Sequence, residues 1–255
     1  MRRVISFVVS DIIRNKIVFV YALLLAVLSW SVFGLEDNSS KGVLTVLNLV
    51  LLVVPLMSIV FSTIYLYNSS EFIELLLSQP IRRARIWKGL FAGLQLSLCS
   101  AFIVGTGVPV LMFVEIKLAC ILLFTGLLLT SVFVSLAFLA SVYTSDKAKG
   151  IGLSILLWLF FSLLFDGILL FIVFQFSDYP IEKTLMVITA FNPIDISRLL
   201  VMLQLDVSAL MGYAGAVFRT FFGTSKGILI SFFIMGLWAF LPFLLSLRKF
   251  KSKDL

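Results

Sequence analysis

Residues 43–68 read VLTVLNLVLLVVPLMSIVFSTIYLYN, an apolar run without a charged side chain. A helix rises about 1.5 Å per residue, so a run of this length is sufficient to cross the roughly 30 Å of hydrocarbon in a bilayer. Hydrocarbon offers the backbone no hydrogen-bond partner, and a crossing segment must therefore satisfy its own N–H and C=O groups. The stretch predicts a transmembrane helix.

Similar runs recur along the whole chain. Hydrophobic residues make up 61% of the 255 residues and charged residues 13%, whereas a soluble domain carries about a quarter charged residues. A transmembrane β-barrel is excluded because its strands alternate in polarity, and these runs are continuously apolar. The sequence predicts one all-α membrane domain spanning residues 1–255. Six spans are expected, at residues 17–35, 43–68, 90–114, 118–142, 150–176 and 227–247.

The basic residues are unevenly divided between the two sets of connecting segments. Fourteen of the 20 Lys and Arg residues lie in segments 1–16, 69–89, 144–149 and 248–255. Because cytoplasmic loops carry the excess of Lys and Arg, both termini are expected to be cytoplasmic. The net charge of +7 then reflects topology. A nucleic-acid-binding surface is disfavoured because the charges are dispersed around helix ends.

Residues 1–16 form an amphipathic segment ahead of the first span. Apolar side chains at three- and four-residue spacing oppose a polar face that carries Arg3 and Arg14. We expect a helix that lies in the inner interface with its apolar side down. It either anchors the first span or also contacts a cytoplasmic partner. It is not a cleavable signal, because Ser10 and Asp11 interrupt its short apolar stretch.

Few side chains suit metal or redox chemistry. The chain has no histidine and two cysteines, Cys99 and Cys120. These cysteines are expected at different depths in the membrane, so we predict small packing residues rather than a disulfide. The spacing of Gly89 and Gly93 allows two helices to approach closely, and we assign it to packing within the bundle.

The longest connection, residues 177–226, is predicted to lie outside the cell and to carry structure, as loops of this length usually do. Asn192 as N-cap, Pro193 and Asp195 form a helix start. A second short helix is expected at 209–222, and the pair would form a helical hairpin in or on the outer leaflet. The candidate residues for gating or for docking an external partner are Asn192, Pro193, Asp195, Arg198, Gln204, Asp206, Met211 and Gly212.

Asp166 is the acidic residue that lies well inside an expected span. Ionised groups in the membrane are costly and are functional candidates by default. The spans contain no Lys, Arg or His to pair with it, which gives a proton relay little support. Asp166 can instead reach interfacial water near the outer third of the membrane, or hydrogen-bond to a neighbouring helix.

No catalytic motif is visible, and this chain is not expected to be an enzyme. Histidine bases, paired carboxylates in a common cleft and the GxSxG motif are absent. The phosphate-binding loop GxxxxGK[ST] is also absent, and the dipeptide Gly-Lys does not occur. If the chain performs work, a partner must supply the energy.

Residues 69–88 contain a compact amphipathic helix between the second and third spans. Ser69 or Ser70 can cap it, Glu71 and Glu74 favour its first turn, and Pro80 ends it. A short rigid helix between two spans can act as a lever, because a push on it moves both spans. The alternative is an interfacial helix whose basic flank only sets topology. That flank contains Arg82, Arg83, Arg85 and Lys88.

The run Glu74-Leu75-Leu76-Leu77-Ser78-Gln79-Pro80-Ile81-Arg82-Arg83 resembles the coupling-helix signature of type-2 ABC exporter permeases. The interfacial helix, the six spans and the long external loop before the last span are also similar to that family along the full chain. Within the family, segments 191–195 and 203–218 resemble the membrane subunits of Nos transporters. Those transporters serve the assembly of the copper centres of nitrous oxide reductase.

The resemblance implies a homodimeric permease in a bacterial inner membrane. Its implied partners are membrane lipids, a separate cytoplasmic ABC ATPase that carries ATP and Mg, and a periplasmic accessory protein of the NosD type. No cofactor or metal is implied on this chain itself, although Met186, Met202 and Met211 are soft enough for Cu(I). The residues implied to meet the ATPase are Glu71, Glu74, Leu75, Leu76, Gln79, Pro80, Arg82 and Arg83.

The expected function is to couple ATP hydrolysis by that partner to the periplasmic maturation of nitrous oxide reductase. Two alternatives stay open. One is an ABC exporter of the same architecture for a lipid, a peptide or an ion. The other is an ATP-independent transporter or a membrane scaffold.

Overall fold

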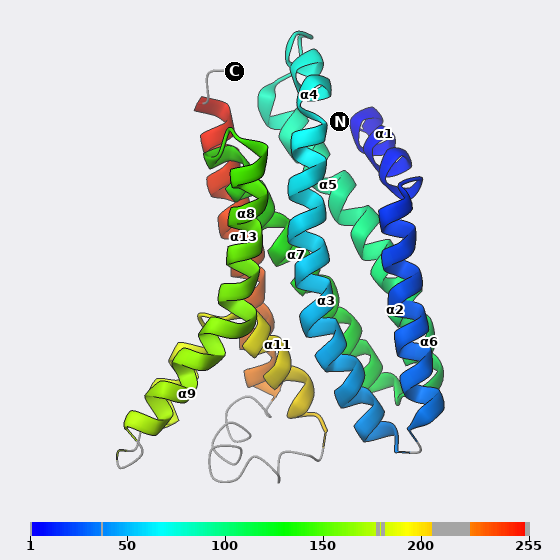
Figure 1. Ribbon diagram of the computed structural model, residues 1–255, viewed down its shortest axis with the longest axis vertical. Coiled ribbons are helices and arrows are strands. Elements are labelled where there is room, and N and C mark those ends of the chain that lie inside the picture. Colours follow the sequence, from blue (N-terminus) through cyan, green and yellow to red (C-terminus); the bar gives the residue numbers. More distant parts are fainter. Residues whose placement is uncertain (1, 37, 177–178, 180–181, 206–224, 253–255) are drawn as a thin grey trace.

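The computed structural model describes residues 2–36, 38–176, 179, 182–205 and 225–252 (Figure 1). Every regular element in these ranges is a helix. Six helical rods among the described residues are long and apolar enough to cross a membrane, which confirms the six predicted spans. Their bounds are Lys16–Leu35, Ser40–Asn68, Arg83–Phe113, Ile116–Tyr143, Lys147–Gln175 and Gly227–Ser252.

Two spans extend further toward the basic segments than the sequence predicts. The third span begins with α5 (Arg83–Phe102), seven residues before the expected start. The last helix, α13 (Ser225–Ser252), continues through Lys249 and Lys251. Long basic side chains tolerate this placement because they extend from the helix into water, and cations at a helix C-terminus also complement its dipole.

The N-terminal helix α1 (Arg2–Ile13) packs against α5. Val8 and Ile12 on its apolar side are fully buried. An added Cβ at Gly89 would lie 3.0 Å from a methyl group of Val4, and one at Gly93 would overlap the Val8 side chain. The predicted close packing of the Gly89–Gly93 pair is confirmed, and its partner is α1. The apolar side of α1 therefore rests on protein.

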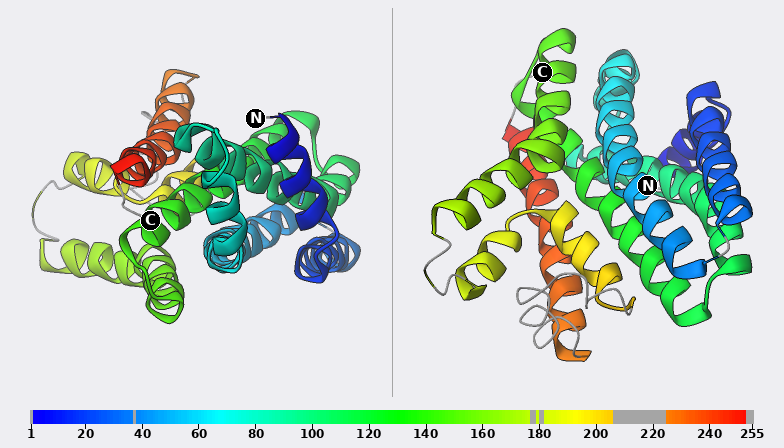
Figure 2. Two further views of the ribbon diagram at one scale, coloured as in Figure 1. Left: turned by 90° about the horizontal axis from the view of Figure 1, so that it is seen from above. Right: turned by 60° about the horizontal axis from the view of Figure 1, so that its bottom comes forward.

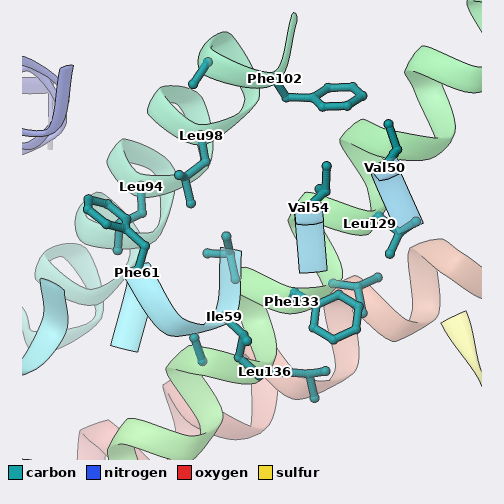
Figure 3. Close-up of a cluster of buried hydrophobic side chains, with 14 of the residues drawn as sticks. Val50, Val54, Ile59, Phe61, Leu94, Leu98, Phe102, Leu129, Phe133 and Leu136 are labelled. Carbon is teal, nitrogen blue, oxygen red and sulfur yellow. The ribbon is translucent and has the colours of Figure 1, made fainter. Parts of the chain in front are cut away.

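The core of the bundle lies where α3 (Ser39–Asn68), α5 and α7 (Ile116–Tyr143) meet. The α7 rod is the most buried of the six spans. Figure 3 shows side chains of α3, including Val54 and Ile59, facing Leu94 and Leu98 of α5 and Phe133 of α7. The apolar residues of these runs show no helical periodicity because a helix at the centre of a bundle is surrounded by apolar neighbours on all sides.

Two spans contain a π-helical turn. The third span consists of α5, η1 (Ile103–Gly107) and α6 (Val108–Phe113). The fifth consists of α8 (Lys147–Leu159), η2 (Phe160–Leu164) and α9 (Phe165–Gln175). Such turns change the direction of a helix and are frequent at functional sites. Beyond η2, α9 diverges from the other spans, as Figures 1 and 2 show.

The remaining helices are at the two ends of the bundle. At one end, α1, α4 (Ser70–Leu77) and the end of α13 lie together (Figure 1), as expected for termini on one side of the membrane. At the other end are α2 (Lys16–Leu35), which runs there from α1, and the short helices α10 (Glu182–Thr189) and α11 (Pro193–Met202). The predicted second hairpin helix at 209–222, with Asp206, Met211 and Gly212, lies outside the described residues.

Replacement of Gly93 by alanine is expected to destabilise the protein by about 1–3 kcal/mol, because the new methyl group forces α1 away from α5. The matched control is Gly152→Ala in α8, where nothing lies within 4 Å of an added Cβ. This control should be neutral or slightly stabilising, since alanine favours the helix. Thermal unfolding in detergent measures both variants, and equal melting temperatures would contradict the packing described here.

Candidate functional site

The α4 helix has the short, well-delimited form that the sequence predicts. It runs from Ser70 to Leu77, with Glu71 in its first turn. Ser69 occupies the N-cap position, but its side chain makes no capping hydrogen bond. At the other end the Ser78 hydroxyl donates to the Leu75 carbonyl at 2.9 Å, and the chain turns at Pro80 before α5 begins.

The inner face of α4 is held by this chain's own side chains. Ile73 and Leu76 are buried in the core. Phe72 stacks on Phe7 of α1, with ring centroids 4.9 Å apart. The apolar residues of α4 therefore divide between two faces, and Leu76, a predicted partner-facing residue, contacts the bundle.

The outer face of α4 and the segment that follows it carry most of the residues predicted to meet an ATPase. The Leu75 side chain on this face is 65% exposed. Arg83 is half-buried at the start of α5 and engages neighbouring groups. The exposed members of the predicted set are Glu71, Glu74, Leu75, Gln79, Pro80 and Arg82.

An open cavity of about 310 Å³ lies between α4 and several spans. Ser70 and Glu74 of α4 line this cavity together with Trp87 of α5, Ser141 of α7 and Phe250 of α13. Trp87 stacks on Phe250 at a centroid distance of 4.1 Å, and its indole N–H donates to Ser246 at 3.0 Å. Trp87 and Phe250 thus join α5 to α13 at the wall of this cavity.

Two further contacts tie the helices together at the end of the bundle that carries α4. The Tyr65 hydroxyl of α3 donates to Asp11 of α1 at 3.1 Å. The Tyr67 hydroxyl donates to the Thr144 carbonyl at 2.9 Å, which joins α3 to the connection between α7 and α8. Together with the stacked Phe7 and Phe72, these contacts make α1, α3 and α4 one mechanically connected unit.

At the opposite end of the bundle, α11 starts as the sequence predicts. Asn192 is the N-cap, and its Oδ1 accepts from Ile194 N–H at 3.0 Å. Asn192 is fully buried, and its Nδ2 donates to the Phe161 carbonyl at 2.8 Å and to Asp195 Oδ2 at 2.9 Å. The cap of α11 is thus attached to η2 of the fifth span.

An ion cluster lies beside this cap. Arg198 Nη1 is 3.1 Å from Asp166 Oδ2 and 3.3 Å from Asp195 Oδ1. The partner of Asp166 therefore comes from α11, outside the six spans, and the hydrogen bond to a neighbouring helix is the alternative that the structure shows. The two carboxylates share one cavity of about 360 Å³, so the expectation of no paired carboxylates in a common cleft was wrong.

Asp195 itself lies outside the six spans. Burial, and after it the neighbouring Asp166 carboxylate, raise the pKa of the Asp195 carboxyl to about 7. Arg198 and Asn192 oppose this shift by stabilising the ionised form. Periodicity could not detect the cluster, because Asp166 and Arg198 are 32 residues apart and belong to different elements.

The other predicted residues are dispersed. Gln204 and Met202 are half-buried at the end of α11. Nothing is described for Met211 or for the side chain of Met186, so copper contact by these methionines stays untested. Cys99 and Cys120 are free thiols, as predicted, and Gln95 Nε2 lies 3.0 Å from Cys99 Sγ.

The chain is similar to two proteins over about four fifths or three quarters of their length. It is 29% identical over 224 residues to the probable ABC transporter permease protein NosY of Pseudomonas aeruginosa, which covers 80% of this chain and 82% of that protein. It is 26% identical over 212 residues to the protein of the same name from Stutzerimonas stutzeri, covering 75% and 77%. No family model matches the chain. The chain is thus a distant homologue of ABC transporter permeases of the NosY type.

The Asn192→Ala variant is expected to lose about 2–4 kcal/mol of unfolding free energy, because it removes the helix cap and leaves Phe161 and Asp195 with unsatisfied buried groups. Asn38→Ala is the matched control, since Asn38 caps α3 through one exposed hydrogen bond to Ser40 N–H. The control should lose about 0.5–1 kcal/mol. Equal losses in denaturant titrations would contradict the attachment of α11 to η2.

Proposed function

We propose that this distant homologue of ABC transporter permeases is the membrane subunit through which a separate ATPase acts on periplasmic maturation of nitrous oxide reductase. The observation that carries the coupling role is the division of α4 into two faces. Its inner face is bound to α1 and the core, whereas its outer face presents Glu74 and Leu75 to solvent.

ATP hydrolysis is assigned to a partner subunit. This agrees with the similarity to permeases and with the lack of a phosphate-binding loop in the sequence. A groove on such an ATPase would receive the exposed face of α4, with Leu75 as the apolar anchor and Glu71 and Glu74 as acceptors for basic groups. The permease would work as a homodimer with one ATPase on each copy.

The mechanism is a shift between two populated states. When ATP brings the two ATPase subunits together, the two α4 helices move with them, and that state is favoured. Each α4 is joined to α1 through Phe7 and Phe72 and to α5 through only five intervening residues, so its displacement tilts the attached spans. The change then reaches the opposite end, where α10 and α11 lie.

The maturation role rests on the similarity to NosY proteins and on the resemblance of the external segments. A periplasmic accessory protein of the NosD type would dock on the outer end of the bundle, in a bacterial inner membrane. Asn192, Pro193 and Asp195 are buried. They would therefore position the docking surface, and the residues beyond α11 would form it.

Glu74→Arg and Leu75→Glu are each expected to reduce co-purification of the ATPase at least about tenfold, which corresponds to about 1.4 kcal/mol. Loading of nitrous oxide reductase with copper should fall in parallel. The control is Glu36→Arg, a charge reversal at an exposed acid at the other end of α2. Leu76→Ala should act differently, by lowering thermal stability, because Leu76 is buried.

The outcomes separate the possible functions. Undiminished co-purification in both α4 variants would defeat the coupling role. If the ATPase is lost but copper loading stays normal, the chain is a permease for another substrate. If no ATPase co-purifies with the wild-type protein, the ATP-independent transporter or scaffold is the better description.

A further inference from the structure

The fifth span is interrupted where α11 attaches to it. In η2 the backbone pairs with the fifth residue along, so that Phe165 N–H bonds to the Phe160 carbonyl. The next carbonyl, that of Phe161, accepts from the buried side chain of Asn192. A π turn interrupts the regular hydrogen bonding of a helix, and helices commonly bend there. Because the Phe161 carbonyl bonds to Asn192, the bend in the fifth span can occur at η2, and α9 can change direction relative to α8.

Aromatic side chains hold this pivot in place. The Phe161 ring packs edge-on against Trp238 of α13, with centroids 5.4 Å apart, and against Phe133 of α7 at 6.2 Å. The Trp238 indole N–H donates to the Ala190 carbonyl just before α11, at 3.2 Å. Trp238 of α13 therefore anchors both η2 and the residue before the start of α11.

The outer part of α9 is much less supported. Leu170, Phe171 and Phe174 are 70%, 66% and 84% exposed, and Figures 1 and 2 show α9 diverging from the bundle. Among the described residues, the ion pairs are those that Arg198 makes with Asp166 of α9 and with Asp195. Asp166 is the second residue of α9, directly after η2, so its bond to Arg198 links the inner end of α9 to α11 by charge.

The ion pair between Arg198 and Asp166 is partly exposed, which allows it to break and re-form. The side chains of Arg198 and Asp166 are 35% and 33% exposed, so both can be rehydrated from the 360 Å³ cavity that they line. Asp195 is nearly buried and remains hydrogen-bonded to Asn192. It would continue to hold Arg198 if Asp166 moved away. The contact between Arg198 and Asp195 within α11 would therefore persist, whereas the contact between Arg198 and Asp166 of α9 could break.

We propose that α9 is a hinged outer segment of the fifth span, with η2 as the hinge and the Arg198–Asp166 ion pair as a latch that holds α9 against α11. Arg198 and Asn192 are positioning residues in this device. Asn192 fixes α11 at the hinge, and Arg198 fixes the orientation of α9. The latch goes beyond the proposed function and can be tested on this chain alone, without an ATPase.

The test measures the position of α9 directly. Nitroxide labels are placed on cysteines introduced at Phe174 of α9 and at Ile116 of α7, both exposed, in a Cys99→Ser/Cys120→Ser background reconstituted in nanodiscs. Pulsed electron spin resonance then reports the distribution of distances. The labelled chain is diluted into an excess of unlabelled protein, so that only distances within one copy are read, and the protein with an intact latch should then give one dominant distance. Arg198→Ala should shift it and roughly double the width of the distribution, as expected when a hinged segment is released.

Two further variants separate the latch from a general structural effect. Asp166→Asn keeps the shape of the side chain and should release α9 with little change in melting temperature. The charge swap Asp166→Arg/Arg198→Asp keeps the net charge of the cluster and should restore the single distance. Lys41→Ala, which removes an exposed cation at the outer end of α3, is the control and should leave the distribution unchanged.

Unchanged distances in Asp166→Asn would overturn the latch, as would a charge swap that folds but stays as broad as Arg198→Ala. If Arg198→Ala does not fold, the isosteric variant and the charge swap decide between these outcomes. Because no ATPase is present, a negative result leaves the coupling role of α4 untouched. Conversely, loss of ATPase binding in the α4 variants would not alter the distances of α9.

Discussion

Hydrocarbon cannot hydrogen-bond to a peptide group, and the rest of this structure depends on that constraint. It requires six continuous helices and makes every departure from the α-helical pattern costly unless a partner is supplied. The two π turns are such departures. At η2 the Phe161 carbonyl has its partner in Asn192, and the same side chain caps the helix that carries Arg198. One buried amide thus allows a bend in a span and places a charge beside it.

The same constraint explains how the two ends of the bundle differ. At the end that carries α4, water is available, and the protein can expose an apolar side chain such as Leu75 on a helix whose other face is buried. Stacking of Phe72 on Phe7 connects that helix to α1, and aromatic stacking and hydroxyl hydrogen bonds join the spans beside it to one another. At the other end, α11 lies among the spans, where charges need partners, and Arg198 forms contacts with two carboxylates.

Local features were predictable because they depend on neighbouring residues. The start of α11 at Asn192 and Pro193 and the extent of α4 before Pro80 follow from backbone chemistry within one helical turn. The close packing at Gly93 was predictable as packing, but its partner was not. Nothing in the sequence around Gly93 indicates that Val8, eighty-five residues earlier, lies against it. The inward direction of Leu76 depends likewise on where α1 and α5 sit.

The sequence alone determined the class of the protein, its six spans, the position of α4 and the cap of α11, because hydropathy, charge bias and capping are local in the chain. Only the tertiary structure decided which face of α4 is free and which residues meet across the bundle. Asp166 and Arg198 are paired because η2 bends the fifth span and α11 packs beside it. That pairing depends on distances between segments that no local pattern encodes.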